Sequence, residues 1–97
     1  MTQKSILHLN LHREWFAAIA VKTKRIEYRR RTPYWKTRLE NRQYDVIQFR
    51  NGYATDAPGM LVEFLGVHRI KKDGKKVYAI RLGKILKIKR WKRVSRD

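Results

Sequence analysis

Apolar and polar residues alternate in the first part of the chain, where Leu7, Leu9 and Leu11 are separated by polar side chains. A period of two residues is typical of a β-strand, because successive side chains of a strand point to opposite faces. The pattern therefore predicts a strand over residues 5–11, with the three leucines on one face.

Two later segments have helical character. Between residues 12 and 21, apolar residues recur at helical spacing (Trp15, Phe16, Ala18 and Ile19), and Leu11 and Trp15 lie four residues apart. The pattern predicts a short amphipathic helix in which Trp15 and Ile19 are buried against the sheet. Pro33 suits the first turn of a helix, so a second, shorter helix is expected over residues 34–41.

The rest of the chain consists of short apolar or alternating runs bounded by turn residues. These runs predict strands over residues 25–30, 44–50, 60–70, 77–82 and 85–91. Asn51-Gly52 indicates a turn and Asp73-Gly74 a tight β-hairpin, because both pairs accept positive φ angles. Gly66 and Gly83 are expected to mark bends or bulges.

Together these elements predict the fold class. Five or six short strands, one main N-terminal helix and a short second helix indicate an α+β fold, a small mixed β-barrel that is closed or nearly closed. Ninety-seven residues correspond to a single domain, residues 1–97, with an adequate but small core.

The net charge of +17 is unevenly distributed. Residues 69–97 contain 13 Lys and Arg against 2 Asp and Glu, a net charge of +11, and residues 1–68 carry the remaining +6. Charge of this density attracts polyanions, which makes nucleic acid, RNA or DNA, the expected partner. A membrane surface would favour a basic amphipathic helix, whereas the basic C-terminal run alternates as a strand, with Lys87 and Lys89 on one face. No membrane partner is expected.

Other residue types narrow the chemistry. The chain has no cysteine, which removes disulfides and thiolate sites. The spacing of His8, His12 and His68 matches no zinc motif, so neither a metal site nor a cofactor is expected. The sequence has no apolar run long enough to span a membrane, and its first residues lack the apolar stretch of a signal peptide. These features predict a cytoplasmic protein, expected to be a monomer.

The run KTKRIEYRRR, residues 22–31, places one carboxylate, Glu27, among basic and aromatic residues. It resembles the signature of the ASCH domains, members of the PUA-like barrel superfamily, written G-x-K-x-x-E-x-R at the junction of the first helix and the next strand. Lys24, Glu27 and Arg29 fill its last three positions, and Lys22 stands where the family has glycine. Similarity to later parts of these domains extends over residues 31–35, 49–53, 61–67 and 78–86. The resemblance implies a PUA-like barrel.

The resemblance also implies a connection with RNA, because ASCH and PUA-like domains are associated with RNA binding and RNA modification. Two small bacterial relatives are enzymes, an acetylcytidine amidohydrolase and a metal-dependent ribonuclease. If this chain were such a hydrolase, Lys24 and Glu27 would be its catalytic residues, and a ribonuclease would use a divalent metal. The amidohydrolase type has a Thr nucleophile three residues after the lysine, where this chain has Glu27, and Thr23 precedes the lysine instead.

The residues expected to bind nucleic acid combine this signature with nearby basic, aromatic and turn positions. They are Lys22, Lys24, Glu27, Tyr28, Arg29, Tyr34, Arg38, Asn51, Gly52, Tyr53, Lys87 and Lys89. Glu27 and Arg29 share one face of the predicted strand, so the two side chains are able to touch. Five roles are open to Glu27: a salt bridge that holds the fold, orientation of Arg29 toward a phosphate, acceptance of a hydrogen bond from a base amine, metal ligation, or general-base catalysis.

Two aromatic positions also have alternative roles. Tyr53, beside the Asn51-Gly52 turn, is placed either to stack on a nucleotide base or to cap the barrel core. Trp35 lies with Tyr34 and Arg38 in a pattern that suits stacking, but a tryptophan on a short helix is expected in the core.

Overall fold

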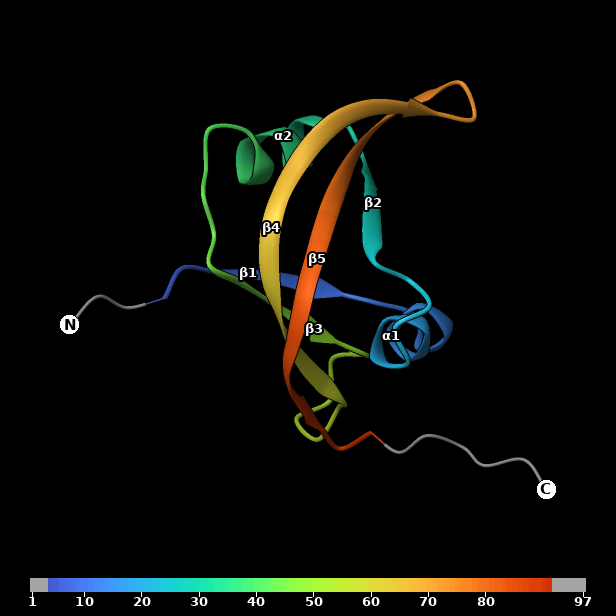
Figure 1. Cartoon of the computed structure of the whole chain (residues 1–97), viewed down its shortest axis with the longest axis vertical. Coiled ribbons are helices and arrows are strands. Elements are labelled where there is room, and N and C mark those ends of the chain that lie inside the picture. The colour runs from blue at the N-terminus through green and yellow to red at the C-terminus, as the bar shows by residue number, and fades with distance from the viewer. Residues whose placement is uncertain (1–3, 92–97) are drawn as a thin grey trace.

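The computed structural model describes residues 4–91, which form one five-stranded mixed sheet and two short helices (Figure 1). The elements in chain order are β1 (Ile6–Asn10), α1 (Arg13–Ala20), β2 (Ile26–Arg30), α2 (Pro33–Leu39), β3 (Val46–Arg50), β4 (Gly59–Lys72) and β5 (Lys75–Lys89). The strand order is β1-β3-β4-β5-β2, with β1 parallel to β3 and the other neighbours antiparallel. The predicted α+β class is confirmed.

The sheet curls because its two longest strands bend. β4 and β5 contain 14 and 15 residues and form the curved ribbon that dominates Figure 1. Their register shifts three times between Leu61 and Gly66, and such bulges increase local twist and curvature. β1 and β2 occupy the two edges of the sheet, so the result is a half-barrel rather than the closed barrel that was one of the expectations.

The two strands predicted at the C-terminal end are a single strand, β5. Gly83 was expected to separate them, but it lies within the strand where β4 approaches closely: a Cβ atom at this position would be 2.9 Å from Cβ of Glu63. The glycine therefore allows close packing of two strands instead of ending one. The predicted hairpin is confirmed, because Asp73 and Gly74 both have positive φ angles, 52° and 75°, between β4 and β5.

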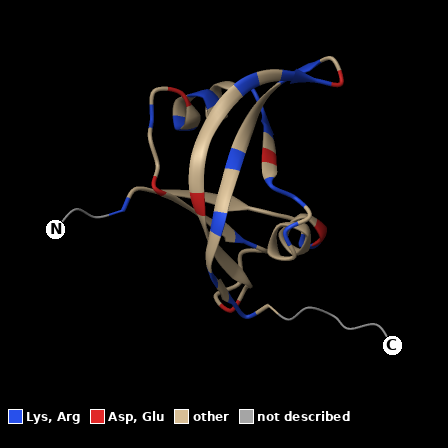
Figure 2. Ribbon diagram, viewed as in Figure 1, with Lys and Arg blue, Asp and Glu red and all other residues tan. Residues whose placement is uncertain are grey.

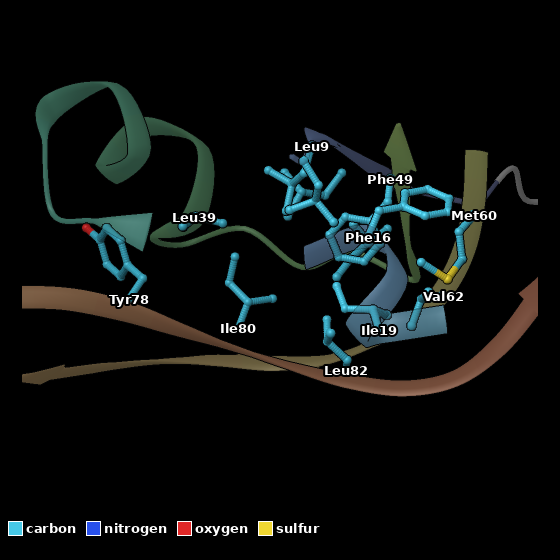
Figure 3. Close-up of a cluster of buried hydrophobic side chains, with 13 residues drawn as sticks. Leu9, Phe16, Ile19, Leu39, Phe49, Met60, Val62, Tyr78, Ile80 and Leu82 are labelled. Carbon is cyan, nitrogen blue, oxygen red and sulfur yellow. The ribbon is translucent and has the colours of Figure 1, made fainter. Parts of the chain in front are cut away.

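The core lies between the concave face of the sheet and the two helices (Figure 3). α1 contributes Phe16 and Ile19, and α2 contributes Leu39, all of them less than 3% exposed. Burial of Ile19 was predicted and is confirmed. Burial of Trp15 was predicted and is wrong, because Trp15 is 47% exposed while its neighbour Phe16 is 1% exposed. Residues three apart and residues four apart both lie on one helical face. In α1 the buried pair is Phe16 and Ile19, three residues apart, and not Trp15 and Ile19, four residues apart.

Within residues 4–91 no helix is both long and apolar enough to cross a lipid bilayer.

Candidate functional site

The turn after α1 sets the position of the signature residues. Lys22 has a φ angle of 68°, in the left-handed region that glycine adopts most easily. The amide of Lys22 donates to the Ile19 carbonyl at 3.0 Å, and the amide of Thr23 donates to the Ala18 carbonyl at 2.9 Å. These two bonds form a Schellman motif with Lys22 at the residue that is usually glycine. The chain makes this turn at some conformational cost, and it leads directly into Lys24 and β2.

Glu27 is the buried charged residue of this region, with 6% of its surface exposed. Its Oε2 accepts from Nε of Arg29 at 2.9 Å and lies 2.7 Å from Nη2 of the same side chain. Nζ of Lys24 lies 3.5 Å from the other oxygen, Oε1. The contact between Glu27 and Arg29 that the strand pattern allowed is therefore present, and the carboxylate is shared by two cations.

Arg29 also links the two edges of the sheet. Its Nη2 donates to the backbone carbonyl of Asn10, the last residue of β1, at 3.0 Å. Its guanidinium carbon lies 5.0 Å from the ring centroid of Trp35, a distance typical of a cation–π contact. Trp35 is half-buried and packs against the core, as expected, but it also positions Arg29.

Lys24 points toward Glu27 and lies between two aromatic rings. Its Nζ is 5.2 Å from the ring centroid of Trp15 and 5.3 Å from that of Tyr28. Both distances fit cation–π attraction. The exposed Trp15 is therefore part of the site, where the sequence pattern had predicted a core residue.

The Asn51–Tyr53 turn is fixed to the end of β1. Asn10 and Gly52 exchange two hydrogen bonds, from Nδ2 of Asn10 to the Gly52 carbonyl at 3.0 Å and from the Gly52 amide to Oδ1 of Asn10 at 3.2 Å. Nδ2 of Asn51 donates to the Leu11 carbonyl at 2.9 Å. Tyr53 follows this anchored backbone and is 88% exposed, so it does not cap the core.

These elements enclose a cleft of about 740 Å³. Its lining residues come from the end of β1, the start of α1, β2, α2 and the turn after β3: Asn10, Leu11, His12, Arg13, Trp15, Glu27, Tyr28, Arg29, Arg30, Thr32, Trp35, Asn51, Gly52 and Tyr53. Six of the predicted binding residues are in this set, namely Glu27, Tyr28, Arg29, Asn51, Gly52 and Tyr53. Lys24 contacts three of the lining residues.

The other predicted residues lie elsewhere. Lys22 lines a smaller pocket beside β5, together with Lys24. Tyr34 and Arg38 stack on each other on α2, with the guanidinium carbon 3.5 Å from the ring centroid. Lys87 and Lys89 line a separate groove at the end of the β4–β5 ribbon.

Several cleft residues were not predicted. Asn10 was placed in the first strand without a site role, Thr32 was given no role, and Trp15 was assigned to the core. Their proximity arises because β2 pairs with β5 while β1 pairs with β3, which brings the two edges of a curved sheet to the same cleft. The sequence did carry one signal for Trp15. The apolar residues of α1 fit two buried faces, one that contains Trp15 and one that contains Phe16.

Glu40, at the end of α2, has a carboxylate whose pKa is shifted. The hydroxyl of Tyr78 donates to Oε2 of Glu40 at 2.5 Å, and this bond lowers the pKa of Glu40 from its ordinary value. Burial raises the pKa of Tyr78, and the bond to Glu40 raises it further. The pair joins the end of α2 to β5.

Charge is distributed unevenly over the ribbon (Figure 2). Basic positions recur along β4, β5 and their hairpin, with one acidic position in β4 and one in the hairpin, and β2 also carries one acidic position among basic ones. Among the residues that the structure describes, no three His, Asp or Glu side chains come together as a metal site would require.

No family model, curated protein or solved structure matches this chain.

Proposed function

We propose that this chain is an ASCH-like domain with a PUA-like fold that binds RNA, and that its cleft receives one unstacked base. The observation that carries the proposal is the Glu27 carboxylate, held in place by Arg29 and Lys24 among aromatic side chains. An acceptor fixed in this way suits the exocyclic amine of an unpaired base.

The hydrogen bonding of Glu27 leaves room for such a ligand. A carboxylate offers about four lone-pair positions. Both Arg29 contacts go to Oε2, whereas Oε1 faces the Lys24 ammonium at 3.5 Å. Oε1 is therefore the oxygen proposed to accept from adenine, cytosine or guanine, each of which carries an amine that uracil lacks.

The walls of the cleft support the same ligand. Trp15, Tyr28 and Tyr53 provide aromatic surfaces for stacking, and Arg13 and Arg30 provide charge for phosphates. Stacking of this kind needs an unpaired base, so the proposed ligand is single-stranded. Single-stranded DNA shares these features except for the 2′-hydroxyl, and it is the alternative nucleic acid. The proposal extends to a monomeric protein acting in the cytoplasm.

A hydrolase is the second candidate. It would use Lys24 and Glu27, whose ammonium and carboxylate form an ion pair at 3.5 Å, as the catalytic residues that the resemblance implies. The nucleophile of an amidohydrolase is harder to assign. Oγ1 of Thr23 donates to the Ala18 carbonyl at 3.1 Å, which uses this hydroxyl at the helix end. A ribonuclease would use a divalent metal, but among the described residues Glu27 is the one acidic side chain that lines the cleft, and no three His, Asp or Glu side chains come together to hold such an ion.

Incubation with a defined pool of single-stranded RNAs, with and without magnesium or manganese, tests both candidates. Retention of RNAs rich in amine-bearing bases over poly-uridine, with no change in length, supports the binding domain. Metal-dependent shortening supports the ribonuclease. Equal retention of every sequence would show that charge alone attracts the RNA. No retention at low salt together with no shortening would reject both candidates.

A further inference from the structure

A second groove lies beside the cleft, at the end of the β4–β5 ribbon where β5 ends. Its volume is about 620 Å³. The side chains that line it come from β3, the following loop, β4 and β5: Gln48, Arg50, Tyr53, Thr55, Ala57, Gly59, Met60, Leu61, Lys87, Lys89 and Arg90. Four of these residues are cations, and among the described residues none of the lining side chains is acidic. The groove is therefore built for an anion.

The cations of the groove are held by regular structure. Lys87 pairs with Leu61 and Lys89 with Gly59 in the antiparallel ladder, so both lysines lie on the same face of β5. Residues two apart on a strand are separated by roughly 6.4–6.8 Å, which lets neighbouring ammonium groups bind successive phosphates of an extended chain. Nη2 of Arg50 donates to the Ala54 carbonyl at 2.5 Å, and this bond positions the guanidinium at the groove wall.

Tyr53 lines both the cleft and the groove. The residue is 88% exposed, yet the backbone before it is fixed by the hydrogen bonds of Asn51 and Gly52. An exposed aromatic ring on an anchored turn between two cationic surfaces is placed to stack on a base.

We infer that one single-stranded RNA occupies both sites, running from the Glu27 cleft across Tyr53 into the groove of Arg50, Lys87, Lys89 and Arg90. This inference rests on the proposed function and adds the length and path of the ligand. One base enters the cleft, the next stacks on Tyr53, and the following phosphates bind the groove. A duplex does not fit this path, because its bases are not available to stack on Tyr53.

Fluorescence anisotropy with labelled oligoribonucleotides of about 4 and about 10 residues tests the path, since these lengths lie within the site sizes of small single-strand-binding domains. The longer RNA is expected to bind the unchanged protein at least about ten-fold more tightly. In the double variant Lys87→Gln, Lys89→Gln this gain should disappear, while the affinity for the short RNA stays within about two-fold. The slope of log K against log salt for the long RNA should flatten by roughly 1.4, about 0.7 for each lost phosphate contact.

Lys75→Gln, Lys76→Gln is the matched control, because it removes the same charge from exposed positions at the hairpin end of the same ribbon. This control should keep the length gain. Tyr53→Ala should weaken the long RNA by about five-fold or more, as expected for a lost base stack, and Tyr53→Phe should restore its affinity.

Three results would overturn the inference. Tight binding of the short RNA with no gain for the longer one would leave the proposed function intact and remove the path. An equal loss for both lengths, or the same loss in the hairpin control, would show a general effect of charge. A Tyr53→Ala protein with unchanged affinity would also contradict the path. Absence of binding by either RNA is a separate result, which rejects the proposed function itself.

Discussion

Arg29 connects the two edges of the sheet, since its Nη2 donates to the Asn10 carbonyl at the end of β1 while its own backbone belongs to β2. The same guanidinium holds Oε2 of Glu27. One side chain thus spans the opening of the half-barrel and orients the buried carboxylate of the cleft. The fold and the candidate site therefore depend on the same contacts.

Arg29→Lys tests this double role. An ammonium cannot reproduce the planar fork with which Arg29 reaches Glu27 and Asn10 together. We expect a loss of about 1.5–3 kcal/mol in the free energy of unfolding, the range for hydrogen bonds to a charged group, measured by urea denaturation. Arg30→Lys is the control, because Arg30 is an exposed neighbour on the same strand, and it should change stability by less than about 0.5 kcal/mol. Equal effects of the two substitutions would contradict the linking role.

Lys22→Gly should stabilise the protein. Lys22 has a φ angle of 68°, and a left-handed conformation costs a residue with a side chain about 1–2 kcal/mol. Glycine removes this cost but loses more conformational freedom on folding, so the expected net gain is about 0.5–1 kcal/mol. Arg25→Gly, three residues later, introduces the same flexibility where the structure does not require a positive φ angle, and it should destabilise. Thermal melting of both variants tests this prediction, with a higher melting temperature expected for Lys22→Gly and a lower one for Arg25→Gly. A lower melting temperature for Lys22→Gly would reject it.

Glu27→Gln separates the roles that the sequence left open. Glu27 is 6% exposed, so its loss affects two partly buried cations, and we expect a cost of about 1–3 kcal/mol in unfolding free energy. If Glu27 accepts from a base amine, the affinity for amine-bearing RNAs should fall by about 1–3 kcal/mol more than the affinity for poly-uridine. Collapse of RNA cleavage by about 10²-fold with intact binding would instead indicate a general base or metal ligand.

Glu14→Gln is the control for charge in this experiment, because Glu14 is an exposed residue of α1 beside two residues that line the cleft. It should slightly tighten the binding of every RNA to a similar degree. If Glu27→Gln gives only this uniform change, Glu27 acts as a structural brace.

The strands, the helices and the Asp73-Gly74 hairpin were predictable because each depends on local pattern. The continuity of β5 through Gly83 was not, since it depends on how closely Glu63 of β4 approaches. The pairing of Glu27 with Arg29 followed from their common strand face. The position of Trp15 in the cleft could not be predicted from the sequence, because it depends on which of two similar helical faces the curved sheet covers.

The pair formed by Glu40 and Tyr78 predicts a dependence of stability on pH. The bond from Tyr78 lowers the pKa of Glu40. The ionised Glu40 carboxylate therefore stabilises the folded state above the ordinary pKa of a glutamate, and this stabilisation is lost as the pH falls through the lowered pKa. Burial raises the pKa of Tyr78, so the contribution of the phenol is lost as the pH rises above the ordinary pKa of a tyrosine. Tyr78→Phe should therefore be less stable than the unchanged protein at neutral pH, and its unfolding free energy should change less at both extremes.

Urea denaturation across the pH range checks this profile, with Tyr44→Phe as the control. The Tyr44 hydroxyl donates to the backbone carbonyl of Arg38 at 2.6 Å, which is a bond to a group that does not titrate. Its removal should lower stability by a similar amount at neutral and acid pH. Parallel acid profiles for Tyr78→Phe and the unchanged protein would show that the bond to Glu40 has no part in acid unfolding.

Trp15 and Phe16 provide the sharpest separation of site from core, because two adjacent aromatic residues on α1 point to different surroundings. Phe16 is 1% exposed within the core, so Phe16→Ala should cost about 3–5 kcal/mol in unfolding free energy. Trp15 is 47% exposed and contacts the Lys24 ammonium, so Trp15→Ala should cost only about 0.5–1 kcal/mol, the value of an exposed cation–π contact.

Trp15→Ala should nevertheless weaken RNA binding by about 1–3 kcal/mol if its ring stacks on the base beside Glu27. Anisotropy on the folded Trp15→Ala protein measures this loss, and Trp15→Phe, which keeps an aromatic face, should recover most of it. A Trp15→Ala protein that binds RNA normally would place the stacking surface on Tyr28 or Tyr53 instead.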